Sequence, residues 1–200
     1  MNILNKILNL IYPKNCIYCN KENTYLCNDC LEKIKQEIKE NQNYVLNYQN
    51  HKTLIHLLKY KNIQSLKQDI AMLLNEYFKK NLKKDKQYIL IPIPLHKHKL
   101  KTRGFNQTEL IAKEVIKLNK NITLNTSLKR KINTKQQAKL SKQKRQKNTQ
   151  NIFKTNDLSL FNKNILIFDD VKTTGATLKS AKQEVQKLHP KHIKTISFLK

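Results

Sequence analysis

The sequence predicts an α/β fold in which a parallel sheet is flanked by helices. Two apolar runs, YILIPIP over 88–94 and NILIFDD over 164–170, are typical of strands buried on both faces. A helical pattern over 175–188 and another apolar strand over 192–199 follow the second run. Strand, helix and strand in this order make a parallel βαβ unit. The sheet of this domain is therefore expected to be built from such units.

Helices are expected before and between these strands. Apolar residues at helical spacing predict helices over 31–40, 53–60, 66–78 and 104–118. The basic stretch that leads into the last of these helices is expected to be a loop. Residues 120–150 are poor in apolar groups, and the expectation there is a solvated loop or a mobile segment.

The length of 200 residues suits one domain with a small appendage. Spaced Ile and Leu residues over 1–13 indicate an amphipathic helix, and no signal-peptide cleavage pattern follows it. A polar gap at 41–43 divides an N-terminal helix and cysteine element, 1–42, from an α/β domain, 43–200. No apolar run approaches membrane-spanning length. The expected location is the cytoplasm, with the inner face of the membrane as an alternative.

The chain is strongly basic. Forty Lys and Arg against 14 Asp and Glu give a formal net charge of +26. This excess indicates a polyanion partner, nucleic acid ahead of anionic lipid. An AT-rich genome also enriches Lys, Asn and Ile, so composition leaves both explanations open. The three arginines, Arg103, Arg130 and Arg145, stand out because a lysine-rich chain keeps arginine where its flat donor geometry is needed.

All four cysteines lie in one short stretch. Cys16, Cys19, Cys27 and Cys30 form two CxxC pairs separated by seven residues. Two such pairs complete a tetrahedral sulfur site, and four thiolates leave no position for water. A structural zinc ion is therefore expected. An iron–sulfur cluster and a redox dithiol pair remain as alternatives.

The stretch ILIFDDVKTTGATL, residues 165–178, predicts a site for a phosphorylated sugar. Asp169 and Asp170 follow a strand at the edge where parallel sheets bind ligands. The turn after them enters a helix, whose free N–H groups favour an anion. Gly175 is one of only two glycines in the chain and lets the backbone close around a ligand. Acceptors for vicinal hydroxyls beside donors for a phosphate suit a ribose 5-phosphate.

The same stretch resembles the phosphoribosyl pyrophosphate (PRPP) signature of type I phosphoribosyltransferases. This resemblance implies the type I phosphoribosyltransferase fold, with the two aspartates facing the ribose hydroxyls and 173–177 wrapping the 5-phosphate. The implied PRPP contacts in this loop are Asp169, Asp170, Val171, Lys172, Thr173, Thr174, Gly175, Ala176 and Thr177.

Three further segments resemble the ComF family of competence-associated, phosphoribosyltransferase-like proteins, which commonly carry an N-terminal zinc element. IPIPLHKHKLKTRGFNQTELIA over 91–112 resembles the family segment PVP…RGFNQ…LA. QAKLSKQKRQKNTQNIF over 137–153 resembles its Q–A–x–L…R–x–x–N…F run, and HLLKYKN over 56–62 resembles its LKYKG element. The resemblance therefore covers nearly the whole chain.

The ComF resemblance implies further PRPP contacts from Lys59, Tyr60 and Arg103, and it makes Lys59 and Arg103 the candidates for a catalytic role. Asn62 stands where relatives often have glycine. Asparagine tolerates a left-handed backbone better than most residues, so the loop is expected to be preserved.

Asn106 and Gln107 are candidates to contact the diphosphate or to organise the neighbouring strand, with a helix cap as the alternative. Mg²⁺ is implied as a second cofactor, carried mainly by PRPP, because a hard cation bridging the pyrophosphate oxygens helps that group to leave.

Two functions are open at this point. The first is a PRPP-binding protein of natural competence that handles incoming single-stranded DNA in the cytoplasm during transformation, with other competence or DNA-uptake proteins as partners. The second is an active phosphoribosyltransferase that moves ribose 5-phosphate from PRPP to a nucleobase or other acceptor in nucleotide metabolism. Whether the protein is an enzyme is left open. The DNA-binding candidates are Lys129, Arg130, Lys131, Lys142, Lys144, Arg145 and Lys147.

Overall fold

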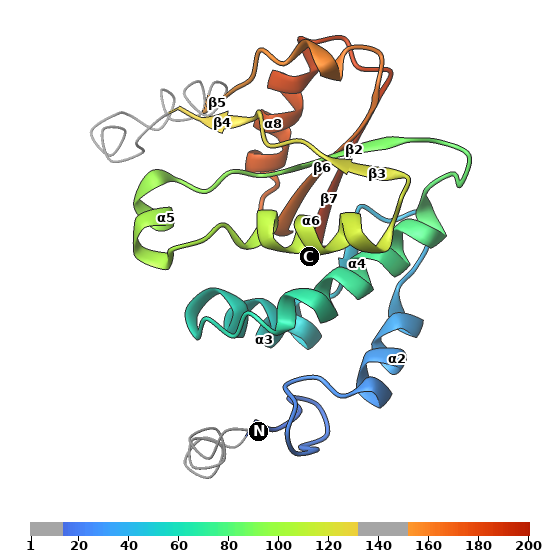
Figure 1. Ribbon diagram of the computed structural model, residues 1–200, viewed down its shortest axis with the longest axis vertical. Helices are drawn as coiled ribbons and strands as arrows, with labels where there is room; N and C mark the ends of the chain where they lie inside the picture. The colour runs from blue at the N-terminus through green and yellow to red at the C-terminus, as the bar shows by residue number, and fades with distance from the viewer. Residues whose placement is uncertain (1–13, 132–151) are drawn as a thin grey trace.

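The structure is a computed structural model that describes residues 14–131 and 152–200. Its centre is a five-stranded sheet (Figure 1). The strand order is β1-β7-β6-β2-β3, and every neighbouring pair is parallel. The strands are β1 (Tyr44–Leu46), β2 (Tyr88–Pro92), β3 (Ile122–Leu124), β6 (Asn164–Val171) and β7 (His192–Leu199). The predicted α/β class is confirmed, including the βαβ unit formed by β6, the following helix and β7.

Helices cover both faces of the sheet. The helices of the described residues are α2 (Asn28–Glu37), α3 (Tyr48–Tyr60), α4 (Leu66–Asn81), α5 (Lys97–Arg103), α6 (Gln107–Leu118) and α8 (Ala176–Gln186), with a 3₁₀ turn, η3 (Leu158–Leu160). Of these, α3, α4 and α6 belong to the core on one face and α8 to the core on the other. The helices predicted around 31–40, 53–60, 66–78 and 104–118 are confirmed within a few residues of their ends. A separate antiparallel pair joins β4 (Lys129–Arg130) to β5 (Phe153–Lys154).

The core has two layers because side chains of a strand alternate between faces. In β6, Leu166 and Phe168 pack into the cluster that α3, α4 and α6 complete, whereas Ile165 and Ile167 pack with α8. All four side chains are at most 1% exposed. A strand buried on both faces explains why 164–168 is almost continuously apolar.

The prediction of a loop before α6 is partly wrong, because residues 97–103 form helix α5. None of its residues is buried. A helix without a buried face has no apolar periodicity, so the pattern that predicts the other helices is missing here. The three-residue strands β1 and β3 were also missed, since three residues are too few to show a strand pattern.

The cysteine element packs on the larger hydrophobic cluster. Leu31, Ile34 and Ile38 are each at most 4% exposed in that cluster, and the Lys80 ammonium of α4 donates to the Ile38 carbonyl at 3.1 Å. The division at residue 42 stays a prediction, and the expected helix over 1–13 lies outside the described residues. Within the described ranges, no helix has the length and apolar character needed to cross a membrane.

Candidate functional site

The loop from β6 into α8 has the backbone that its glycine predicts. Gly175 caps α8 with φ of 77°, in the left-handed region, and its carbonyl accepts from the Lys179 N–H at 2.9 Å. Thr173 and Thr174 are exposed on the outside of this loop. The first N–H groups of a helix have no acceptor within the helix. The loop therefore presents hydroxyl and backbone donors at the carboxyl edge of the sheet.

Asp170, at the end of β6, is held by two side chains from distant helices. Lys59 Nζ, from the end of α3, lies 2.7 Å from Asp170 Oδ1. The side-chain amide of Gln107, at the start of α6, donates to the other carboxylate oxygen. Asp170 is only 4% exposed, so both partners compensate a charge that has little contact with water.

Asp169 has a different environment. Burial, followed by the charge of Asp170, raises its pKa to about 7, although Lys59 and Arg130 act in the opposite direction. Arg130 comes from β4, and its own pKa is lowered by burial against the attraction of Asp169. The strand end thus carries one carboxylate that is firmly paired and one carboxyl that exchanges its proton near neutral pH.

The predicted residues Lys59, Tyr60 and Arg103 gather beside these acids. The Arg103 guanidinium lies 5.4 Å from the centre of the Tyr60 ring and donates to the Gln107 side-chain oxygen. Arg103 is therefore linked to Asp170 indirectly, by hydrogen bonds through the Gln107 side chain. The predicted contact of Arg103 with PRPP stays a prediction. The expected left-handed backbone is confirmed at Asn62, with φ of 54°.

Asn106 occupies the N-cap position of α6 but makes no capping bond with its side chain. Its amide instead donates to the Ile93 carbonyl at 3.1 Å, just beyond β2. These contacts show that Asn106 and Gln107 organise the strand ends, and their predicted contact with the diphosphate stays a prediction.

A pocket of about 760 Å³ lies beside β4, and its lining includes Arg130, whose charge acts on Asp169, but neither of the two acids. Its basic lining residues are Lys97, Lys129, Arg130, Lys131 and Lys154. Its one acid, Glu109, is paired with Lys113 at 2.7 Å. Lys97 and Lys154 were missed, because single lysines in a lysine-rich chain carry no signal.

Arg130 lies at the wall of this pocket, with its guanidinium 5.8 Å from the centre of the Phe153 ring and its buried Nε unpartnered among the described residues. The remaining DNA-binding candidates, Lys142, Lys144, Arg145 and Lys147, lie outside the described residues.

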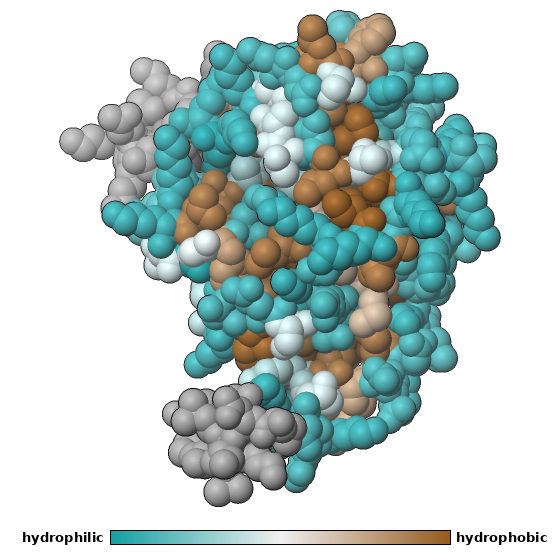
Figure 2. Space-filling view, viewed as in Figure 1, coloured by the Kyte–Doolittle hydropathy of each residue, from teal (hydrophilic) through white to brown (hydrophobic). Residues whose placement is uncertain are grey.

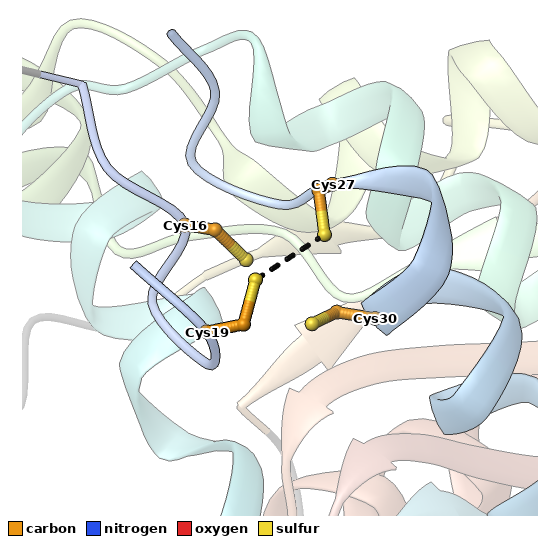
Figure 3. A group of neighbouring side chains, drawn as sticks. All are labelled: Cys16, Cys19, Cys27 and Cys30. Atoms are coloured by element: carbon orange, nitrogen blue, oxygen red, sulfur yellow. Dashed lines mark hydrogen bonds between the residues drawn. The ribbon is translucent and has the colours of Figure 1, made fainter. Parts of the chain in front are cut away.

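The four cysteine side chains point toward one another (Figure 3), and their sulfur atoms all lie within 4.8 Å of one another. Tetrahedral zinc with Zn–S bonds of about 2.3 Å holds its sulfurs about 3.8 Å apart, so this group fits the ion. Cys19 is exposed, and the other three are buried. Burial opposes ionisation of Cys16, but hydrogen bonds from the backbone of Cys27, Tyr18 and Cys19 bring its pKa down to about 6. A thiolate is the form that binds metal.

The fold and these sites define a parallel α/β protein with a glycine loop at its strand edge and four cysteines positioned to bind a metal. No protein-family model matches the chain. It is 36% identical over 97 residues to competence protein ComFC of Bacillus subtilis, covering 48% of this chain and 38% of that protein. It is 27% identical over 183 residues to competence protein F of Haemophilus influenzae, covering 86% and 79%. It is 28% identical over 197 residues to ComFC of Streptococcus pneumoniae, covering 95% and 82%. The predicted resemblance to ComF proteins is thereby confirmed.

Among solved structures, the chain is similar to a hypoxanthine phosphoribosyltransferase of Staphylococcus aureus, with 15% identity and a TM-score of 0.40. It is also similar to a hypoxanthine-guanine phosphoribosyltransferase of Bacillus anthracis, with 16% identity and a TM-score of 0.37. Each match covers 68% of this chain, and 62% and 65% of those enzymes respectively. The chain thus spans less than two thirds of either enzyme.

Proposed function

We propose that this protein is a PRPP-binding, ComF-type protein that acts in natural competence by handling incoming single-stranded DNA in the cytoplasm. The observation that carries the proposal is the placement of two acids directly before a left-handed glycine loop, at the carboxyl edge of a parallel sheet. Acceptors and donors lie there in the order that a ribose 5-phosphate requires.

In this proposal, Asp169 and Asp170 accept hydrogen bonds from the ribose hydroxyls, and the backbone and hydroxyl groups of 173–177 donate to the 5-phosphate. Lys59 shares Asp170 with the sugar, which keeps its ammonium next to the bound ligand. Mg²⁺ enters with the diphosphate. The diphosphate oxygens supply most of its ligands, since Mg²⁺ is usually bound by one or two carboxylates together with substrate phosphates. The cysteines hold a structural zinc ion.

The DNA arm of the proposal rests on charge. The formal charge of +26 favours a polyanion, and the basic pocket gathers Lys129, Arg130 and Lys131, of which Arg130 also acts on Asp169. Figure 2 shows one face of the molecule, on which hydrophilic residues surround a more hydrophobic middle. Other competence or DNA-uptake proteins are the expected protein partners, because the similar proteins are named for competence.

Active phosphoribosyl transfer is the second candidate, and Asp169 favours it. A carboxyl with a pKa of about 7 beside the sugar site suits proton transfer to or from an acceptor at neutral pH. Pyrophosphate release in the presence of PRPP, Mg²⁺ and a panel of nucleobases tests this candidate. If PRPP binds but no nucleobase of the panel leads to pyrophosphate release, the competence role without transferase activity is favoured.

Calorimetry with PRPP and Mg²⁺ tests the binding site. The variants Asp169→Asn and Asp170→Asn keep the shape of each side chain and remove its charge, and we expect both to bind PRPP at least tenfold more weakly. Asp85→Asn is the matched control, because Asp85 is an exposed acid in the turn before β2. Equal heats from the wild type and the first two variants overturn the assigned site.

Anisotropy with single-stranded DNA over a salt series, set against heparin, tests the DNA arm. If the protein binds DNA no more tightly than heparin and loses both in moderate salt, bulk charge explains the binding and the proposed DNA handling is contradicted.

A further inference from the structure

Tyr60 is an exposed aromatic ring at the edge of the candidate sugar site. It ends helix α3 directly after Lys59, the partner of Asp170, and it is 67% exposed. Tyr77, an aromatic residue of the neighbouring helix α4, is fully buried. A large ring left in water next to a ligand site leaves apolar surface that a flat ligand can cover.

Two planar groups hold this ring. The His56 ring, one turn earlier in α3, lies with its centre 5.0 Å from the centre of the Tyr60 ring. The Arg103 guanidinium of α5 lies 5.4 Å from the same centre. A ring fixed in this way loses little conformational freedom when a ligand stacks on it, because its rotamer is already restricted. We define Tyr60, His56 and Arg103 as the aromatic platform.

The aromatic platform is linked to the acids of the sugar site. Arg103 donates to the Gln107 side-chain oxygen, and the Gln107 amide donates to Asp170. From the other side, Lys59 binds Asp170 at 2.7 Å. A ligand stacked on Tyr60 therefore lies two side chains away from the carboxylate that faces the sugar. Arg103 at the ring and the exposed Lys61, next to Tyr60 in the chain, supply charge for phosphate groups.

We propose that the aromatic platform stacks an unpaired nucleobase beside the PRPP site. An exposed ring bordered by cations matches the way in which proteins bind single-stranded nucleic acid without reading its sequence. The base comes either from a DNA strand or from a free acceptor nucleobase or nucleoside, which share the same flat π-surface. This inference rests on the proposed function, since it names what lies next to the phosphorylated sugar.

The test uses the full chain with two probes, a short single-stranded oligonucleotide that contains 2-aminopurine and the free 2-aminopurine nucleoside. Stacking on a protein ring quenches 2-aminopurine fluorescence. The variants are Tyr60→Phe, which keeps a ring, and Tyr60→Leu, which keeps only an apolar side chain. Phe161→Leu is the matched control, because Phe161 is 61% exposed beyond η3.

We expect the wild type and Tyr60→Phe to quench the probe, and Tyr60→Leu to bind it roughly tenfold more weakly with its fluorescence restored. Phe161→Leu should behave as the wild type does. Quenching of the oligonucleotide alone assigns the aromatic platform to a DNA strand, and quenching of the nucleoside as well assigns it to the base itself. Absence of quenching with both probes, or equal quenching by Tyr60→Leu, overturns the proposal.

Calorimetry of the wild type with PRPP and Mg²⁺ separates this result from the proposed function. If quenching depends on Tyr60 but calorimetry detects no binding of PRPP, the proposed function is contradicted and the stacking site is retained. PRPP heat without such quenching removes the stacking site alone. Circular dichroism of Tyr60→Leu confirms that the variant is folded before either result is used.

Discussion

Lys59 and Asp170 form an ion pair of 2.7 Å between side chains that are only 16% and 6% exposed. The two residues lie 111 positions apart, and their contact fixes the end of α3 to the end of β6. The same contact places a cation beside the acids that precede the ligand loop. Stability, and in the proposed function PRPP binding as well, therefore depend on one pair.

Replacement of Lys59 by Met should lower the free energy of unfolding by about 3 kcal/mol, because it leaves the Asp170 carboxylate buried with only Gln107 as a partner. Urea unfolding followed by circular dichroism measures the change. The exposed neighbour Lys61 provides the control, since Lys61→Met should change stability by less than about 0.5 kcal/mol. A combined Lys59→Met and Asp170→Asn variant should recover part of the loss, and strict additivity would show that the pair is not the cause.

Asp169 should make the protein less stable as the pH rises from about 4 to about 7. Its folded pKa of about 7 lies above the ordinary value of 3.8, so in this range the folded state holds a proton that the unfolded state has lost. The contribution of Asp169 to the free energy of unfolding is fully present below its ordinary pKa of 3.8 and is lost as the pH rises through its folded-state pKa of about 7. Asp169→Asn removes this dependence and should therefore be more stable than the wild type above pH 7, with the difference closing toward pH 4. Urea midpoints of both proteins across this range test the sign, and a difference that is constant with pH would contradict it.

The cysteine element should contain one zinc ion per chain, measured by atomic emission. Its removal by a chelator should lower Tm by about 10 °C, because binding free energy at such sites is folding free energy and this element packs on the main core. Cys19→Ser should lose the ion, whereas Glu22→Gln in the same element should retain it. An unchanged melting curve after complete removal of the metal would mean that the site does not support the fold.

Gly175 and Gly104 form a matched pair for the ligand loop. Both have positive φ, 77° and 81°, so replacement by Ala should cost each about 1 kcal/mol of stability. A Cβ at Gly175 meets the Lys172 side chain at 3.0 Å, whereas nothing lies within 4 Å at Gly104. Gly175→Ala should therefore also displace Lys172 and weaken PRPP binding several-fold, with a smaller effect from Gly104→Ala. Calorimetry decides, and equal affinities would show that the loop does not close on the ligand.

Much of the fold was predictable because its signals are local. The apolar run before Asp169, the spacing of Leu and Ile in α4 and α6, and the two CxxC pairs each lie within a short stretch of chain. The left-handed backbone at Asn62 and Gly175 follows from residue type. Helix α5 and strands β1 and β3 were missed, since α5 buries nothing and the strands are three residues long.

The sequence by itself determined most of the elements, the glycine loop after β6 and the metal-binding spacing, because each depends on residues close together in the chain. Only the tertiary structure decided which side chains meet there: that Lys59 and Gln107 hold Asp170, that Arg130 approaches Asp169, and that Arg103 lies over Tyr60. These contacts join segments from different helices and strands. Packing of the helices on the sheet sets their distances, and no periodicity along the chain encodes which two side chains come within reach of each other.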